Sequence, residues 1–349
     1  MAVSAFLLES EAQLTGVETY REQARRALDP LVWDYLEHGA GAGRSTAEAA
    51  TAWQRLALRP RILRGITDSE IATSALGTDL ALPIMTAPNG RATRFAPQGE
   101  AAVIEGTQSA GTIAVLPSSV VPSLPALHSL YPSAAIWQQL YMFRDRGRMR
   151  ERLHMVREEG ALAVVLTVDL LPDTSWKLPA PPHAPWEAVG AVPDPSMFVA
   201  ADMDDLAWLC RETDLPVVVK GVLRDDDAVL CLEAGAAALI VSNHGGNQLD
   251  TAISSADALP EVVAAVNGRA EVYVDGGIRD GLSVLKALAL GARAALIGRP
   301  VSYALAAGGG EAVATMMKEL SGELARAMAL CGANSLADID PSLVRATAP

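Results

Sequence analysis

The stretch LPVVVKGVLRDDDAVLCLEAGAAALIVSNHGG, residues 215–246, contains one complete repeat of the pattern that decides the fold. An apolar run at 216–222 is followed by a helical pattern at 225–234, which ends at Gly235, a residue type suited to a helix C-terminus. A second apolar run, 238–245, comes directly after it. Both runs have the length of a strand and are nearly all apolar, as expected where both faces are covered. The stretch therefore predicts a strand–helix–strand unit of a parallel sheet.

The same alternation continues from this unit toward both ends of the chain. Helical patterns separate eight apolar runs, which lie at 82–88, 112–118, 134–141, 162–169, 216–222, 238–245, 271–277 and 294–300. Eight such units predict an α/β fold that closes into a (β/α)8 TIM barrel. The alternative is an open, doubly wound sheet, which usually carries a GxGxxG motif after its first strand. No such motif follows 82–88, so the barrel is favoured.

The domain organisation follows from the same pattern. We expect a single domain over residues 1–349, with an N-terminal helical segment, a barrel at about 82–335 and closing helices around 316–330. A proline-rich stretch at 170–200 interrupts the alternation after the fourth strand and cannot be an ordinary helix. Such an excursion is typical of either an active-site lid or a disordered segment, and both remain open.

Composition excludes several classes of function. The net charge of −13 disfavours nucleic acid and anionic membranes as partners. The chain has neither a long uncharged apolar run nor a secretory signal at its start, so we expect a cytoplasmic location. The cysteines Cys210, Cys231 and Cys331 lie far apart, which predicts buried thiols and neither a zinc site nor a disulfide framework. The basic cluster at 144–152 is mixed with acids and is interpreted as a solvated helix face.

Polar residues stand where the apolar runs stop, which is the edge at which a barrel places its chemistry. Strand ends meet water and are often polar, so a single aspartate there would mean little. A lysine and a histidine after solid apolar runs need a better reason. The residues at these ends are Asn89, Gln139, Tyr141, Thr167, Asp169, Lys220, Ser242, Asn243, His244, Asp275 and Arg299.

Lys220 and His244 are the strongest candidates among them. A buried lysine is costly unless an anion or a dipole compensates it, so Lys220 implies an electron-rich group at the barrel mouth. His244 precedes Gly245 and Gly246, which permit close approach of a ligand. We therefore expect His244 to be catalytic. The other histidines are interpreted as ordinary surface or core residues: His38, His128, His154 and His183.

Two glycine-bearing turns end the last two runs. They are DGGIRDG at 275–281 and GRP at 298–300, with Arg279 and Arg299 as their cations. Loops after the last strands of a barrel commonly bind a phosphate through backbone N–H groups and a nearby guanidinium. The turns therefore predict a phosphorylated ligand.

Six motifs in fixed order then resemble the FMN-dependent α-hydroxy-acid oxidase and dehydrogenase family, which includes glycolate oxidase and the lactate and mandelate enzymes. They are QLY, LTVD, VVKGV, VSNHGGNQLD, DGGIR and LGARAALIGRP. The resemblance runs from LDPLVWDYLEHGAG at 28–41 to the end of the chain. It implies an FMN cofactor, a small-molecule substrate and, from its relatives, a homo-oligomer.

The resemblance also implies roles for individual positions. FMN would be held by Pro88, Asn89, Ser118, Gln139, Thr167, Lys220, Asp275, Gly276, Gly277, Arg279, Gly298 and Arg299, the last six around its phosphate tail. His244 would move a proton as hydride passes from the substrate carbon to flavin N5, with Asp169, Tyr141 and Lys220 completing the catalytic set. Tyr35 and Tyr141 would hydrogen-bond the substrate. No metal is implied.

Departures from the family pattern lie on the substrate side. Asn247 replaces the arginine that would grip the substrate carboxylate, and Trp176 or Lys177 stands where a second arginine is expected. Pro117 and Ser119 replace a flavin-contacting serine and an aromatic residue. A lost guanidinium removes about 1.5–3 kcal/mol of binding. We therefore predict a 2-hydroxy acid or derivative larger than glycolate or lactate, in contact with Asn247 and Trp176.

Three alternatives come from other classes of function. The HGGN segment is similar to premycofactocin synthase, which suggests oxidation of a C–N centre in an amine or a peptide-derived intermediate. A Schiff-base lyase would use Lys220 as its nucleophile. A flavin-binding protein without catalysis would explain the missing arginines, but it would need neither His244 nor Asp169.

Overall fold

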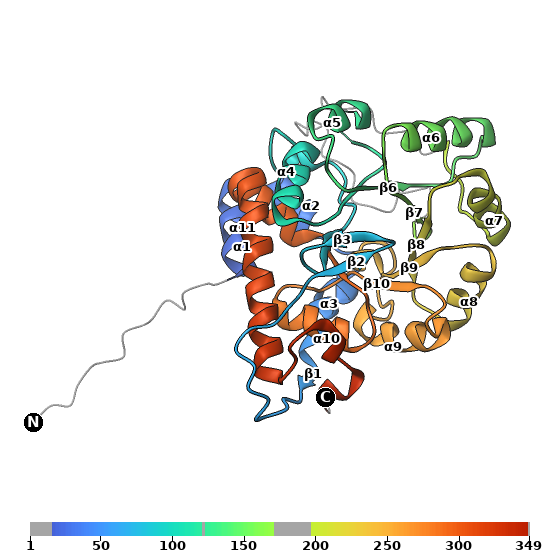
Figure 1. Cartoon of the computed structure of the whole chain (residues 1–349). Helices are drawn as coiled ribbons and strands as arrows, with labels where there is room; N and C mark the ends of the chain where they lie inside the picture. The colour runs from blue at the N-terminus through green and yellow to red at the C-terminus, as the bar shows by residue number, and fades with distance from the viewer. Residues whose placement is uncertain (1–15, 121–122, 171–196, 348–349) are drawn as a thin grey trace, which may run out of the picture.

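The computed structural model describes residues 16–120, 123–170 and 197–347. Eight parallel strands close into a barrel, and each coincides with one of the eight apolar runs (Figure 1). The predicted (β/α)8 fold is confirmed. In barrel order the strands are β4 (Ile84–Thr86), β5 (Ala114–Leu116), β6 (Ile136–Leu140), β7 (Ala163–Thr167), β8 (Val217–Val222), β9 (Ala238–Val241), β10 (Glu271–Val274) and β11 (Ala295–Ile297).

Alternation along the strands divides the core into two parts. One set of side chains fills the barrel interior, including Met85, Trp137 and Tyr273, and none of these three is exposed to solvent. The other set packs outward against the helices, as Leu166 and Leu239 do. Because the interior is packed with large side chains, the barrel is closed, and ligands can enter only at its ends.

A ring of helices covers the outer face of the barrel (Figure 1). The predicted helical patterns are present with ends shifted by a few residues. A long helix, α11, contains both the last barrel helix and the predicted closing helix, joined at a kink of non-helical backbone at Gly308 and Gly309. The helices are α4 (Glu100–Ala110), α5 (Leu124–Leu130), α6 (Arg146–Glu158), α7 (Met203–Glu212), α8 (Asp225–Glu233), α9 (Ser255–Val266), α10 (Gly281–Ala289) and α11 (Arg299–Cys331).

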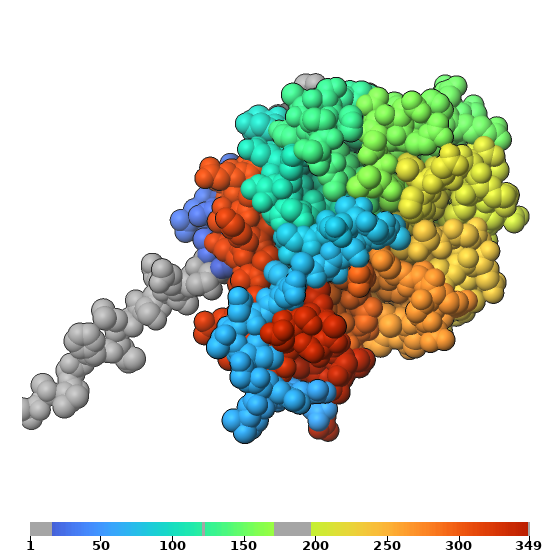
Figure 2. Space-filling view, in the orientation of Figure 1, coloured from blue at the N-terminus to red at the C-terminus, as the bar shows by residue number. Residues whose placement is uncertain are grey.

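A short antiparallel hairpin, β2 (Thr73–Ala75) and β3 (Thr78–Leu80), crosses the amino-terminal end of the barrel. In Figure 2 this light-blue segment lies over the middle of the molecule, where it covers the barrel end. Ala75 and Leu80 pack with the interior side chains, and the Leu76 N–H donates to Glu271 Oε2 at 2.9 Å. The hairpin closes this end, which leaves the carboxyl end of the strands for chemistry.

The N-terminal helices pack against the barrel wall and its carboxyl end. They are α1 (Val17–Ala27), α2 (Pro30–Glu37) and α3 (Arg44–Gln54). Backbone N–H groups of Ala42 and Ser45 donate to Asp250, in the loop after β9, at 2.9 and 3.0 Å. Ala40 N–H donates to the carbonyl of Gly246 at 2.8 Å. The segment that precedes the barrel therefore forms part of the wall around its mouth.

Smaller elements complete the chain. The strand β1 (Leu56–Leu58) pairs antiparallel with β12 (Val344–Ala346). In the part of the chain that the structure describes, short 3-10 helices lie in loops, at η1 (Ala92–Arg94), η3 (His244–Gly246), η4 (Leu336–Asp338) and η5 (Pro341–Leu343). Within the described ranges, no helix combines the length and the apolar character that a bilayer span would require.

Two interpretations of surface chemistry need correction. Cys231 and Cys331 are buried free thiols as expected, but Cys210 is only half-buried. The basic cluster at 144–152 is not uniformly solvated. Arg146 stacks on the ring of Trp208, with 4.1 Å between its guanidinium carbon and the ring centre. Arg152 is partly buried and donates to the carbonyl of Ser118 at 3.2 Å.

Candidate active site

The polar strand-end residues come together because they continue the inward-facing set of each strand. Along β6, Trp137 fills the interior, and Gln139 and Tyr141 follow it at intervals of two residues. The same spacing carries Val165 to Thr167 and on to Asp169 after β7. Because alternate residues of a strand face the same side, the inward-facing positions change from apolar in the barrel interior to polar at its mouth within two residues.

Lys220 lies on the inner face of β8 and is buried. Its Nζ donates to Ser242 Oγ at 2.9 Å and lies 3.3 Å from Asp275 Oδ2. Burial alone would lower the pKa of Lys220, but the carboxylates of Asp275 and Asp169 outweigh it, and the pKa lies above its usual value. Lys220 therefore remains a protonated ammonium. A Schiff-base nucleophile must instead be a neutral amine.

His244 is paired with Asp169 across the mouth. Its Nδ1 lies 2.8 Å from Asp169 Oδ1. Because a carboxylate only accepts, Nδ1 must carry the hydrogen, which leaves Nε2 to accept a proton when the ring is neutral. Burial would raise the pKa of Asp169, but Lys220 and His244 outweigh it and lower that pKa. The carboxylate is therefore ionised and able to stabilise a positively charged imidazole ring.

A glycine permits this pair to form. Gly221 interrupts the regular pairing of β8 at a bulge and has a φ of +117°. A Cβ atom built on Gly221 would lie 2.6 Å from Asp169 Cβ, which is too close for any side chain. Strand β8 can therefore carry Lys220 beside Asp169 only with glycine at the next position.

Two tyrosines that are predicted to contact the substrate interact with each other electrostatically at the mouth. Burial raises the pKa of Tyr141 to about 12, and Lys220, Asp169 and Tyr35 also act on it. Its phenol is therefore a hydrogen-bond donor over the whole physiological range. Tyr35, from α2, is about half exposed (49%), and the guanidinium carbon of Arg94 lies 4.3 Å from the centre of its ring.

Gln139 is held in one orientation by Ser118. The Ser118 N–H donates to Gln139 Oε1 at 2.9 Å, and the Ser118 hydroxyl donates to the Gln139 carbonyl at 3.0 Å. The amide nitrogen Nε2 of Gln139 is buried and has no hydrogen-bond partner in the described structure. The same holds for Thr167 Oγ1 and Asp275 Oδ1. Unmatched buried polar atoms are rare in native proteins, so these three atoms need a partner that the described protein residues do not supply.

The two late turns form a second, positively charged end of the site. Arg299 opens helix α11 after Gly298, and it donates to the backbone carbonyls of Leu36, Gly245 and His38 at 3.0–3.1 Å. Burial first, and then the positive charge of Arg279, lower the pKa of Arg299. Two guanidinium groups that repel one another at a helix N-terminus form a site suited to a phosphate.

The DGG turn has tighter constraints than its sequence suggests. Gly276 and Gly277 have φ values of +93° and +76°. A Cβ atom on Gly277 would lie 1.9 Å from the carbonyl oxygen of Ala49 in α3. The carbonyl of Gly276 accepts from Trp53 Nε1 at 2.8 Å. The glycines therefore allow α3 to pack on this turn as well as leaving room for a ligand.

The remaining predicted site residues are placed as follows. Asn89, after β4, donates to Ser302 through a short hydrogen bond from Nδ2. Pro88 precedes it and is half-buried. Asn247 ends the turn that begins at His244 and is half-buried at the mouth. Trp176 lies outside the described residues.

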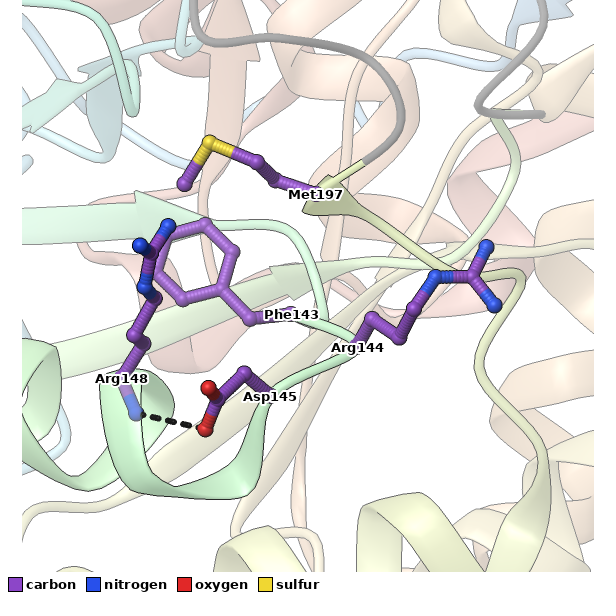
Figure 3. Close-up of a pocket in the computed structure, with 5 residues that line it drawn as sticks. All are labelled: Phe143, Arg144, Asp145, Arg148 and Met197. Atoms are coloured by element: carbon purple, nitrogen blue, oxygen red, sulfur yellow. Dashed lines mark hydrogen bonds between the residues drawn. The ribbon is translucent and has the colours of Figure 1, made fainter.

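A pocket is lined by residues that include none of the catalytic candidates: Phe143, Arg144, Asp145, Arg148 and Met197 (Figure 3). The ring of Phe198 contacts both Tyr141 and Phe143, with centre-to-centre distances of 5.5 and 5.2 Å. Phe198 therefore connects Tyr141 with Phe143, which lines the pocket. In Figure 3 the Phe143 ring lies between Met197 and Asp145, with Arg148 alongside and Arg144 extending away. Among the described residues that line this pocket, none is a base or nucleophile comparable to His244.

Some residues of the site were not among the predicted site residues. Ser242 accepts from both Lys220 Nζ and the His244 N–H, at 2.9 and 3.0 Å, and so fixes both of them. Its place at the end of the β9 run was a usable signal. Arg94 and Arg152 were missed for a different reason. Their contacts are to residues far along the chain, and no local pattern reveals them.

Comparison with known proteins agrees with this geometry. The family model for FMN-dependent dehydrogenases matches residues 24–177 and 187–346. The chain belongs to the FMN-dependent dehydrogenase family. Within this family, it is 40% identical to L-lactate oxidase of Nostoc sp., covering 93% of this chain and 96% of that protein. It is 34% identical to 2-hydroxyacid oxidase 1 of Homo sapiens, covering 95% of this chain and 97% of that protein.

Solved structures of family members share the fold. A mandelate oxidase crystallised with benzoyl-formic acid matches with a TM-score of 0.86 at 36% identity, covering 95% of this chain and 98% of that one. Another mandelate oxidase, solved with (S)-2-phenylpropionate, matches with a TM-score of 0.85 at 35% identity and the same coverage.

The family cofactor FMN fits the residues present. The partnerless polar atoms at Gln139, Thr167 and Asp275 lie at the end of the barrel that the hairpin leaves open. Ring nitrogens and oxygens of a flavin would satisfy them, and the guanidinium groups of Arg279 and Arg299 would face its phosphate. The protein is an FMN-dependent oxidoreductase.

Proposed function

We propose that this protein oxidises a 2-hydroxy acid with His244 as the base. The observation that carries the proposal is the His244–Asp169 pair, 2.8 Å apart, beside the buried ammonium of Lys220 at one barrel mouth. FMN, when bound, supplies the acceptor for the hydride that leaves the substrate carbon. The relatives named L-lactate, 2-hydroxyacid and mandelate oxidases support this choice of substrate class.

The protein's own residues would divide the work. His244 Nε2 would take the substrate hydroxyl proton, and Asp169 would stabilise the resulting imidazolium. Tyr141, protonated because burial raises its pKa to about 12, would donate to a substrate oxygen. Lys220 would stabilise negative charge that develops on the acceptor side. Gln139, Thr167, Arg279 and Arg299 would hold the cofactor.

We further propose a substrate larger than glycolate or lactate. Asn247 offers no charge, and Ser119, near Gly90 across the mouth, offers little bulk. Oxidation of a C–N centre is not favoured, because the relatives carry the names of hydroxy-acid oxidases. The single-domain organisation, a homo-oligomeric state and a cytoplasmic location remain predictions.

The experiment is an anaerobic reduction assay on the purified yellow holoenzyme, with a panel of 2-hydroxy acids, their amides and esters, and 2-amino acids. We expect bleaching by at least one bulky 2-hydroxy acid. His244→Gln should retain FMN while reduction slows by roughly 10²- to 10⁴-fold. A colourless protein that takes up no FMN, or near-normal bleaching in the variant, would contradict the proposal.

A further inference from the structure

The turn that carries His244 has an unfavourable backbone conformation. His244, Gly245 and Gly246 are consecutive residues with φ values of +55°, +63° and +77°. This left-handed region is sterically unfavourable for a residue with a Cβ atom, and His244 has one. Such a conformation persists only where the surrounding structure holds it. The direction of the His244 side chain therefore depends on the groups that hold this turn.

A segment far away in the sequence holds the turn by its carbonyl groups. Residues 40–46 run from the loop after α2 into the first turn of α3 and lie against the turn at 244–246. The Ala40 N–H donates to the Gly246 carbonyl at 2.8 Å, and the Thr46 hydroxyl donates to the Gly245 carbonyl at 3.3 Å. A Cβ atom on Gly246 would lie 2.5 Å from the Thr46 backbone nitrogen, so the two backbones are in close contact. Segment 40–46 therefore restrains two of the three left-handed residues.

Asp250 anchors segment 40–46 to the loop that carries the turn. Its Oδ2 accepts from the Ala42 N–H at 2.9 Å, and its Oδ1 accepts from the Ser45 N–H at 3.0 Å. Gly43, the N-cap residue of α3, has no side chain that could accept these N–H groups, so Asp250 supplies the cap from another part of the fold. Hydrogen bonds from Ser45 and Ala42 lower the pKa of Asp250, which keeps a negative charge at this helix N-terminus. Asp250 thus holds the first turn of α3 in place.

These contacts form a continuous path from Asp250 to the proposed base. Asp250 fixes two backbone N–H groups of segment 40–46, and the residues on either side of them hold the two carbonyls that follow His244. His244 is thereby directed toward Asp169, with 2.8 Å between Nδ1 and Oδ1. We propose that Asp250 is a positioning residue for His244, and that it acts through segment 40–46 rather than by contact with the substrate. The inference rests on the proposed role of His244 as the base.

The test compares two pairs of matched variants. Asp250→Asn keeps the shape of the side chain, but its NH2 group cannot accept, so one backbone N–H loses its acceptor. Asp338→Asn is the control, because Asp338 likewise accepts from two backbone N–H groups, both at 2.9 Å, but it caps η4.

The second pair removes a hydroxyl from the same helix. Thr46→Val removes the donor to the Gly245 carbonyl and keeps the branched shape. Thr51→Val is its control, because the Thr51 hydroxyl donates only within α3, to the carbonyl of Glu48 at 2.9 Å.

Three quantities are measured on the FMN-loaded protein. They are the limiting rate of flavin reduction at saturating 2-hydroxy acid, the dissociation constant of FMN, and backbone hydrogen exchange in a peptide spanning 242–252. The N–H groups of Gly246 and Asn247 are hydrogen-bonded within the turn, so their exchange reports its opening.

We expect Asp250→Asn to slow flavin reduction and to speed exchange in this peptide, each roughly 10-fold. Thr46→Val should change both in the same direction, by roughly 3- to 10-fold, because it removes one neutral hydrogen bond. The dissociation constant of FMN should stay within about threefold in both variants. Asp338→Asn and Thr51→Val should leave all three quantities within about twofold of wild type.

Several results would overturn the inference. A lower melting temperature with a normal limiting rate would show that Asp250 only stabilises the fold. Equal changes in Asp250→Asn and Asp338→Asn would show that any lost cap has the same effect. If Asp250→Asn folds poorly, Thr46→Val decides, and normal reduction and exchange in that variant would contradict the proposal. Failure of the proposed function is distinct, because wild type would then be reduced by no 2-hydroxy acid while hydrogen exchange would still report whether Asp250 holds the turn.

Discussion

Asp169 serves two partners of different kinds. Its Oδ1 accepts from His244 at 2.8 Å, and its charge also acts on Lys220, whose pKa it helps to raise. Because the pKa of Asp169 is lowered, its carboxylate remains ionised below the pH at which an ordinary aspartate takes up a proton. The ionic form that the pair requires is therefore retained into the acid range and is lost only as the pH falls through this lowered pKa.

Asp169→Asn should separate orientation from charge. An amide keeps the shape but cannot stabilise an imidazolium, and it can force the wrong tautomer on His244. We expect the rate of flavin reduction to fall by roughly 10²- to 10⁴-fold with FMN retained, measured by anaerobic stopped flow. Asp226→Asn, the same change at an exposed aspartate paired with Arg224, should have no effect. A normal rate in Asp169→Asn would remove the carboxylate from the mechanism.

Arg152 contacts a pair of residues, Ser118 and Gln139, that are predicted to hold the cofactor. Its guanidinium donates to the carbonyl of Ser118, and Ser118 in turn orients the Gln139 amide. Arg152→Met should weaken FMN binding by roughly 10-fold, as a charge-assisted hydrogen bond is lost. The visible flavin spectrum should shift with it, which a purely global loss of stability would not produce. Arg150→Met, on the same helix but paired with Glu212 at the surface, is the control, and an equal effect there would refute the assignment.

At the scale of elements, α3 and the turn after β10 are fitted to each other. Gly277→Ala should disrupt this contact, because the added Cβ would lie 1.9 Å from the Ala49 carbonyl oxygen. Gly268→Ala is a matched control, since Gly268 has a similar φ of +72° with nothing within 4 Å of the added atom. We expect Gly268→Ala to cost about 1–2 kcal/mol from backbone strain alone. Gly277→Ala should cost clearly more and lower the melting temperature further. Equal melting temperatures would show that α3 moves aside freely.

The sequence predicted the elements with long, regular patterns and missed those without them. Eight apolar runs of strand length mark the barrel, and each is present. The β2–β3 hairpin and the β1–β12 pair were not predicted, because their short strands, unlike those of the barrel, do not lie within an apolar run of strand length. The contact of α3 with Asp250 joins positions about two hundred residues apart. Only the closed barrel brings such positions together, so no local pattern could indicate it.

The sequence predicted the candidate site about as well as it predicted the fold. Lys220, His244 and Asp275 stand out because each breaks an apolar run. Arg152 was interpreted as part of a solvated surface because its neighbours in sequence are charged, whereas the fold turns it toward Ser118. Side-chain direction on a helix depends on what packs against it, which the cluster at 144–152 does not reveal.

For the molecule as a whole, the net charge is negative, but the turns after β10 and β11 carry local positive charges. The chain carries −13, yet Arg279 and Arg299 repel one another at the mouth, where burial and Arg279 lower the pKa of Arg299. FMN should therefore stabilise the fold more than riboflavin, which has the same ring but no phosphate. Scanning calorimetry of the apoprotein at equal ligand concentrations measures the difference in melting temperature. Arg279→Met should shrink it, and equal stabilisation by both ligands would place the phosphate elsewhere.

The pairing of β1 with β12 ties distant parts of the chain to one another. Strand β1 begins two residues after α3 ends, and the Thr347 N–H donates to the carbonyl of Arg55 between them, at 2.8 Å. The last described residues thus hold the end of α3, the helix that packs on the turn after β10. A tag, a cleavage or a fusion at the C-terminal end should therefore alter FMN binding from a distance. Loss of colour after removal of a few C-terminal residues would then indicate that α3 no longer packs firmly on the turn after β10.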